Sequence, residues 1–152
     1  MSNKFLRQLL LTQCQVLVEQ RIRSAKEAIR MAQESANEEG KSSAGDKYET
    51  GRAMAQLEIE KASSQLAEAN KSKQALEQVP VDVSGPVVKS GSLVITNQGS
   101  YFISIAAGKL VVDRELWFAI SPGSPLGAIL LGKKEGDVVK MMGKEILVEK
   151  VV

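Results

Sequence analysis

The residues best suited to chemistry lie in an acidic turn between two long helix-forming segments. Glu38, Glu39, Asp46 and Glu49 bring several carboxylates into this short stretch. The sequence contains no histidine, which excludes Ser-His-Asp and Cys-His catalysis and metal sites that need an imidazole ligand. Any catalysis must therefore depend on carboxylates, on lysines or on a site borrowed from a partner.

The spacing of Asp46 and Glu49 also has a purely structural interpretation. An acid at a helix N-cap, followed three residues later by Glu, has the arrangement of a capping box. Acidic side chains are favoured in the first turn of any helix because they complement the helix dipole. Capping and ligand binding are compatible, since a cap could fix the carboxylates in position, and both interpretations stay open.

Helices are predicted on both sides of the turn. Residues 4–39 contain no Pro or Gly and are rich in residues that favour helix. In both segments, apolar residues recur at alternating spacings of four and three, which is typical of a coiled-coil seam. Opposed seam positions lie equally far on either side of Ser42, which predicts an antiparallel hairpin. The first seam comprises Val18, Ile22, Ala25, Ile29, Ala32 and Ala36, and the second comprises Tyr48, Arg52, Ala55, Ile59, Ala62, Leu66, Ala69, Lys73 and Leu76.

The second helix is predicted to end at residues 79–86, whose two prolines and one glycine cannot continue it. Beyond this point, short β-branched or aromatic runs alternate with turns that contain glycine. This pattern is typical of a small, mainly antiparallel sheet. The strands are expected at residues 92–96, 101–106, 109–112, 116–120, 137–142 and 145–151.

A short apolar helix is expected within this sheet region, at residues 126–131. Ser124 is its N-cap, Pro125 lies in its first turn and Gly132 ends it. The chain is therefore predicted to be an α+β protein with two domains. The first is an antiparallel coiled-coil hairpin over residues 1–79 with an acidic tip near 38–49, and the second is a small antiparallel β domain over 80–152.

Composition narrows the classes of function. The 152 residues include 20 basic and 18 acidic side chains, so no overall basic excess points to nucleic acid. The single Cys14 excludes an intramolecular disulfide and fits a reducing compartment. No apolar run reaches membrane-spanning length. We expect a cytoplasmic protein with no membrane association.

Residues 124–139 (SPLGAILLGKKEGDVV) carry a resemblance to a known family. A Ser-Pro pair, an apolar helical turn, Gly-Lys and a valine-rich strand resemble the C-terminal signature of bacterial Gre-type transcript cleavage factors. The order of a helical hairpin followed by a small β domain is also similar to that family. The resemblance implies an FKBP-like fold for residues 80–152.

The tip of the hairpin resembles the same family in part. Cleavage-active members carry Gly-Asp-Leu-Lys/Arg-Glu-Asn at this place, and this chain has Gly45, Asp46 and Glu49 in the matching order, without the leucine and the asparagine. The resemblance implies that the hairpin enters the secondary channel of RNA polymerase. There Asp46 and Glu49 would help to hold a Mg²⁺ ion shared with the polymerase, and the complex would cleave backtracked RNA. The chain would be an activator and not a self-sufficient enzyme.

Further contacts follow from the resemblance or from charge. In the family, the β domain contacts the polymerase rim, which implies a docking role for the signature segment. Basic residues on the hairpin could contact RNA or the channel walls, or they could form an ordinary solvated face. The docking candidates are Ser124, Pro125, Leu126, Gly132 and Lys133, and the basic candidates are Arg21, Arg23, Lys26, Arg30 and Arg52.

Other functions remain open at this stage. A secondary-channel regulator without cleavage activity would keep the polymerase contact and reach nascent RNA only through the polymerase. An FKBP-like prolyl isomerase or chaperone would use aromatic residues of the β domain, although Tyr101, Phe102, Trp117 and Phe118 are expected to pack in a core, with one of each adjacent pair facing it. A coiled coil that only mediates oligomerisation is a further alternative. For the polymerase-binding protein we expect a monomer.

Overall fold

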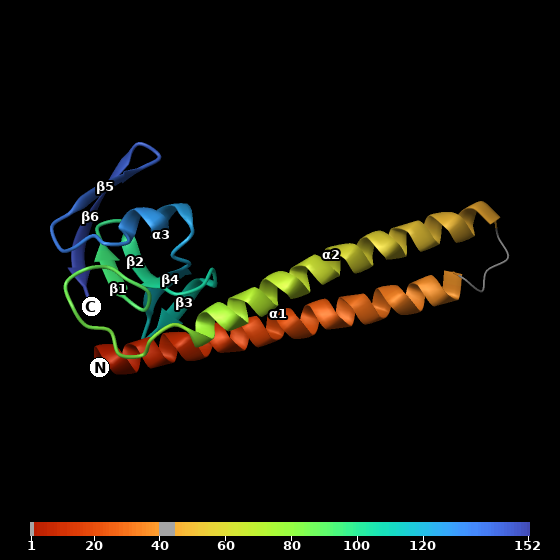
Figure 1. Ribbon diagram of the computed structural model, residues 1–152, viewed down its shortest axis with the longest axis horizontal. Helices are drawn as coiled ribbons and strands as arrows, with labels where there is room; N and C mark the ends of the chain where they lie inside the picture. The colour runs from red at the N-terminus through yellow and green to blue at the C-terminus, as the bar shows by residue number, and fades with distance from the viewer. Residues whose placement is uncertain (1, 40–44) are drawn as a thin grey trace. The chain divides into compact units, whose positions relative to one another are not determined.

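The computed structural model describes residues 2–39 and 45–152, with side chains described outside 39–48. The protein is α+β: two long helices, α1 (Asn3–Glu39) and α2 (Gly45–Glu77), precede a six-stranded sheet that carries α3 (Pro125–Leu130) (Figure 1). The chain forms two compact units, one of Met1–Leu17 with Gln74–Val152 and one of Val18–Lys73. None of the described helices is both long and apolar enough to cross a membrane.

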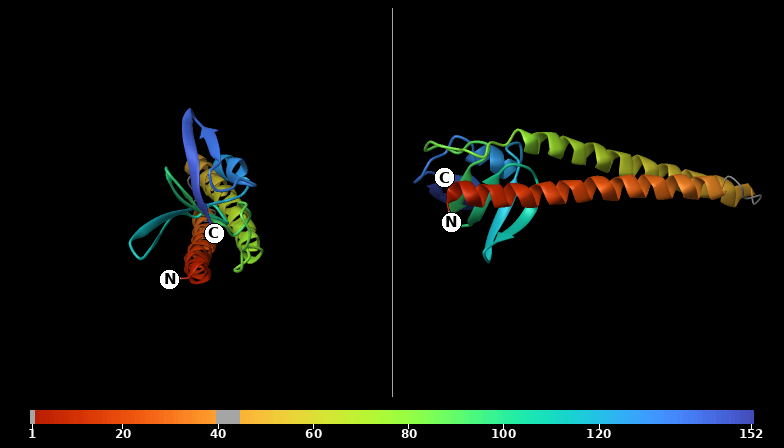
Figure 2. Two further views of the ribbon diagram at one scale, coloured as in Figure 1. Left: turned by 90° about the vertical axis from the view of Figure 1, so that its left-hand side faces the viewer. Right: turned by 90° about the horizontal axis from the view of Figure 1, so that it is seen from below.

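In the Val18–Lys73 unit, α1 and α2 run antiparallel (Figures 1 and 2). Burial of the predicted seam is confirmed at most of its positions, while Arg52 is exposed. Lys73 is also exposed, and its Nζ lies 3.0 Å from Glu19 Oε1 on α1. Much of the buried surface between these helices is therefore made by small side chains. The buried seam residues of this unit are Val18, Ile22, Ala25, Ala32, Ala55, Ala62 and Ala69.

The sheet has the strand order β3-β4-β2-β1-β6-β5. All neighbouring pairs are antiparallel except β2 and β4, which are parallel. The prediction of a mainly antiparallel sheet is confirmed, and the parallel pair makes the sheet mixed. The chain passes from β2 to β3 and then turns back into β4, which lies between them and runs in the same direction as β2. The strands are β1 (Leu93–Thr96), β2 (Gly99–Ile103), β3 (Gly108–Val112), β4 (Glu115–Ile120), β5 (Val138–Met141) and β6 (Lys144–Val151).

The central strands β1 and β2 have buried residues on both faces, which changes the expected role of the aromatic residues. Phe102 and Trp117 are buried, whereas their neighbours Tyr101 and Phe118 are half-buried. Tyr101 packs against a second cluster on the other face, and its ring centroid lies 5.9 Å from that of Phe118. The expectation that only one of each pair would face a core is therefore wrong for Tyr101 and Phe102. In the second pair Trp117 is buried and Phe118 is half-buried. This second cluster contains Val88, Val94, Ile103, Leu130, Val139, Ile146, Val148 and Val151.

The first turns of α1 belong to the same unit as the sheet and are tied to the loop after α2. Arg7 is only 2% exposed, and its guanidinium donates from Nε to the Gly91 carbonyl at 2.6 Å and from Nη1 to the Val81 carbonyl at 3.0 Å. Burial lowers the pKa of Arg7, and the Asp82 carboxylate opposes this shift. At Gly91, φ is +89° and an added Cβ would press on Val83 and on backbone. The loop is thus shaped around a buried cation.

Candidate functional site

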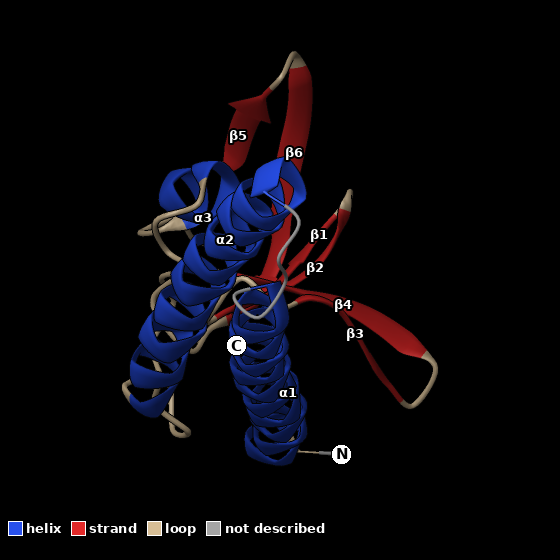
Figure 3. Cartoon of the chain, turned by 90° about the vertical axis from the view of Figure 1, so that its right-hand side faces the viewer, coloured by secondary structure: helices blue, strands red, loops and turns tan. Residues whose placement is uncertain are grey.

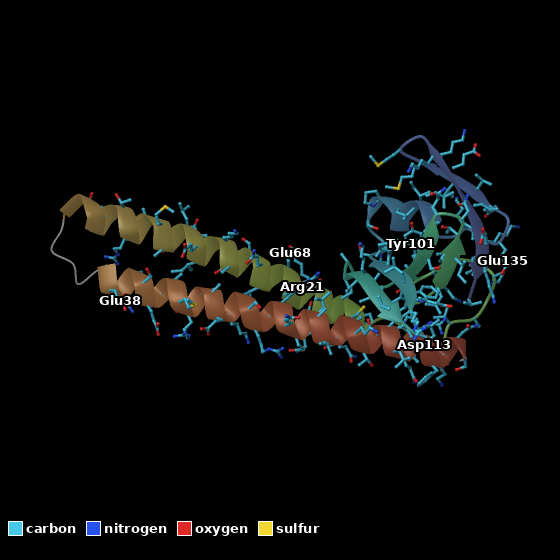
Figure 4. All side chains as sticks on the ribbon, turned by 180° about the vertical axis from the view of Figure 1, so that it is seen from behind. Arg21, Glu38, Glu68, Tyr101, Asp113 and Glu135 are labelled. Carbon is cyan, nitrogen blue, oxygen red and sulfur yellow. The ribbon has the colours of Figure 1, made fainter. Side chains whose placement is uncertain are left out.

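The predicted acidic tip falls partly outside the described residues. The side chain of Asp46 and the residues 40–44 lie beyond what the structure describes, as does the side chain of Glu39. Glu38, near the end of α1 (Figure 4), is exposed to solvent. Glu49, in α2, is also exposed. The part of the tip that is described therefore presents two carboxylates to solvent.

The backbone nevertheless fixes how positions 46 and 49 relate. Both lie in the first turns of α2, which begins at Gly45, and residues three apart on a helix share a face. With Gly45 as the first residue of α2, Asp46 lies in the first turn of the helix. Its side chain, on which the predicted capping box depends, lies outside the described residues. Two acids on one face in the first turns of a helix are also favoured by its dipole.

The sequence predicts that the tip contributes to a metal site of a partner, and the described residues contain no complete metal site. Among the residues whose side chains are described, no group of three or more His, Cys, Asp or Glu is arranged to hold a metal ion. Two carboxylates on one helix face match the small number of protein ligands that Mg²⁺ usually takes. Residues 46 and 49 could therefore contribute ligands to an ion that is held mainly by other groups.

Arg30, one of the basic candidates, is already engaged by two carboxylates of its own helix. Its guanidinium contacts both oxygens of Glu27, at 2.6 and 3.0 Å, and Oε1 of Glu34 at 2.6 Å. Hydrogen bonding from Arg30 lowers the pKa of Glu27, while the same contacts raise the pKa of Arg30. Together, Glu27, Arg30 and Glu34 carry a net negative charge. The positive charge of Arg30 is therefore already compensated and is not available to RNA.

The other basic candidates lie on the surface of the helix pair. Arg21, Arg23, Lys26 and Arg52 are all exposed, and Figure 4 labels Arg21 on α1. Arg23 and Lys26 are three residues apart on α1 and therefore share one face. The feature that this spacing supports is a basic pair, Arg23 with Lys26, on one face of α1.

The signature segment is held by a dense local network at α3. Ser124 is the N-cap of α3: its hydroxyl accepts from Gly127 N at 3.1 Å and donates to the Ser121 carbonyl at 2.7 Å. A Cβ at Gly127 would overlap the Ser121 carbonyl oxygen. Pro125 occupies the first turn, as predicted. The Ser-Pro-x-Gly pattern therefore has a structural cause: α3 approaches the Ser121 carbonyl so closely that only glycine fits at position 127.

The residues after α3 form a second backbone contact. Gly132 has φ +79° and donates its N–H to the Val88 carbonyl at 2.9 Å, while Val88 N donates to the Lys133 carbonyl at 2.8 Å. Leu126 is half-buried against the Val88-containing cluster. Of the docking candidates, Pro125 and Gly132 are exposed, and the side chains of Ser124, Leu126 and Lys133 are partly covered.

Sequence reasoning missed the buried cation and the ion-pair group. The spacing of Glu27, Arg30 and Glu34 was a readable signal, because residues three and four apart on a helix meet. Arg7 offered no such signal, since its partners are carbonyl groups more than seventy positions away.

Comparison with known proteins adds no family to this description. Scanned against models of protein families and searched against curated proteins, the sequence gives no match in either case.

Proposed function

We propose that the chain is a Gre-like transcription factor that binds RNA polymerase and inserts its helix pair, as a coiled-coil hairpin, into the secondary channel. The observation that carries the proposal is the placement of residues 46 and 49 on one face of α2, at the end of a pair of long antiparallel helices. A mostly exposed helix pair with acids at its end is suited to carrying carboxylates into a site of another protein.

Within this proposal, Asp46 and Glu49 are the residues that would hold Mg²⁺ together with the polymerase. When bound, the ion would activate water and stabilise the charge that develops during phosphodiester hydrolysis. The chain's own contribution is to position its carboxylates, because a helical segment fixes their spacing better than a loop would. Glu38, exposed on α1, adds negative potential that would attract the cation.

The sheet unit supports the proposal through its signature segment. The capped α3 and the backbone contact between Val88 and residues 132–133 give this segment one defined conformation. We propose that the unit has an FKBP-like fold, that it contacts the polymerase surface through the segment 124–133, and that Arg23 and Lys26 line the channel. The protein would act in the cytoplasm as a monomer and meet nascent RNA only through the polymerase.

A backtracked elongation complex tests the proposal. Addition of the full chain with Mg²⁺ is expected to shorten the RNA from its 3′ end, and Asp46→Asn with Glu49→Gln is expected to abolish the shortening while polymerase binding persists. Glu58→Gln, at an exposed acid further along α2, is the matched control and should leave cleavage unchanged.

The same assay separates the alternatives. Binding to polymerase without cleavage by the unaltered chain would favour a regulator that has lost cleavage activity. Absence of any polymerase binding would refute the proposal.

A further inference from the structure

Two hairpins of the sheet have the same turn geometry but very different turn residues. The β3–β4 turn has Asp113 at φ 49° and Arg114 at φ 67°, and the β5–β6 turn has Met142 at φ 52° and Gly143 at φ 78°. Figure 3 shows each as two strands joined by a short loop, and Figure 4 labels Asp113. Positive φ at both turn residues is the signature of a type I′ turn.

Met142 is poorly suited to the position that it occupies. The first residue of such a turn is usually Asn, Asp or Gly, because these tolerate left-handed backbone. Asp113 follows this preference in the other hairpin, which shows that the geometry does not require methionine. Met142 is also 92% exposed, so its apolar side chain is left in water. The position therefore carries both backbone strain and exposed apolar surface, and strained residues of this kind are concentrated at functional sites.

Residues near Met142 add further exposed apolar surface and positive charge to the hairpin. Val138 and Leu147 are cross-strand partners on the solvent-facing side of the hairpin, and they are 53% and 38% exposed. Lys140 and Lys144 are exposed on the two strands near the turn, and Glu145, opposite Lys140, offsets one of these charges. The end of the hairpin is thus an exposed methionine in a local environment with net positive charge.

We propose that the end of the β5–β6 hairpin is a docking element, and that Met142 inserts into an apolar pocket rimmed by carboxylates on a partner protein. The flexible thioether of methionine adapts to irregular apolar surfaces. Carboxylates around the partner's pocket would attract Lys140 and Lys144 and so guide the encounter. The choice of RNA polymerase as the partner to test rests on the proposed function. The docking element itself is separate from residues 46 and 49 and from α3.

The test compares turn variants of the full chain for binding to core RNA polymerase. Met142→Asn removes the apolar group and relieves the backbone strain, so it is expected to raise the thermal midpoint of unfolding while weakening binding at least tenfold. Met142→Leu keeps an apolar side chain and should retain most of the affinity. Asp113→Asn, at the same position of the other hairpin, is the matched control and should leave the affinity unchanged.

The outcomes distinguish the two proposals. If the unaltered chain binds and Met142→Asn binds equally well, the docking element is refuted and the proposed function stands. If the unaltered chain does not bind polymerase, both proposals fail. Sedimentation of the chain with anionic phospholipid vesicles in a manner that depends on Met142 would overturn the protein pocket in favour of a membrane surface.

Discussion

At the scale of single residues, Arg7 and Gly127 stabilise the sheet unit, and replacing either residue should lower the free energy of unfolding. Arg7 joins α1 to two loop carbonyls, and Gly127 allows α3 to approach the Ser121 carbonyl. Each position admits one residue type for a stated physical reason. Both roles can be tested without any knowledge of function.

Replacement of Arg7 is expected to destabilise the protein strongly. Arg7→Met keeps much of the side-chain volume but leaves the Gly91 and Val81 carbonyls without their donor. The free energy of unfolding should fall by about 2–4 kcal/mol, because hydrogen bonds to a buried charge are among the stronger ones. Urea denaturation measures the change. Lys4→Met, which removes an exposed ion pair with Asp82, is the control, and an equal effect from both variants would contradict a special role for Arg7.

Gly127→Ala is expected to lower stability by about 2 kcal/mol or more, because the added methyl group meets backbone that cannot move away easily. Gly123→Ala is the matched control, since a Cβ there meets nothing within 4 Å. Thermal unfolding of the two variants provides the comparison. Equal midpoints would show that the turn before α3 can relax.

At the scale of elements, the ion-pair group on α1 predicts a pH dependence. The pKa of Glu27 is lowered from its ordinary value of 4.5 by its bond to Arg30. The contribution of Glu27 to helix stability is therefore complete above about pH 5 and is lost as the pH falls through the lowered pKa. Glu27→Gln should flatten part of the acid-induced loss of helix seen by circular dichroism. The control Glu58→Gln should follow the unaltered chain, and identical curves for all three proteins would contradict the role of Glu27.

The buried alanines between α1 and α2 predict a second effect at this scale. Ala62 is 3% exposed, so Ala62→Arg would bury a charge without a partner or force the helices apart. We expect the unfolding free energy of the helix pair to fall by at least about 2 kcal/mol. Ala67→Arg, at an exposed position of the same helix, is the matched control and should be close to neutral. Helical signal during urea denaturation reports the difference.

The sequence predicted the helices and strands better than the order in which the strands pair. Both long helices, the six strands and the cap at Ser124 follow from local spacing and turn chemistry, which act over a few residues. The parallel pairing of β2 with β4 could not be predicted in this way, because strand order depends on contacts between distant segments. Arg7 was missed for the same reason, since a charged residue on a helix is expected to be exposed.

At the tip, the sequence predicted the start of the second helix to within a residue or two, since α2 begins at Gly45. The helical backbone places positions 46 and 49 on one face, and that placement is the part that the proposed function uses.

At the scale of the whole molecule, the chain combines a helix pair that ends in acidic residues with a sheet unit that we propose to be the docking part. The two parts would have complementary tasks, one reaching into the partner and one holding its surface. In the proposed complex with RNA polymerase, each part of the chain therefore has a defined place.

An electron cryo-microscopy reconstruction of the full chain bound to core RNA polymerase tests that claim most directly. We expect α1 and α2 to occupy the secondary channel, with residues 46 and 49 next to the catalytic metal of the polymerase and the sheet unit on the outer surface. A complex in which the helix pair lies outside the channel, or the absence of a complex at concentrations that saturate polymerase-binding factors, would contradict it.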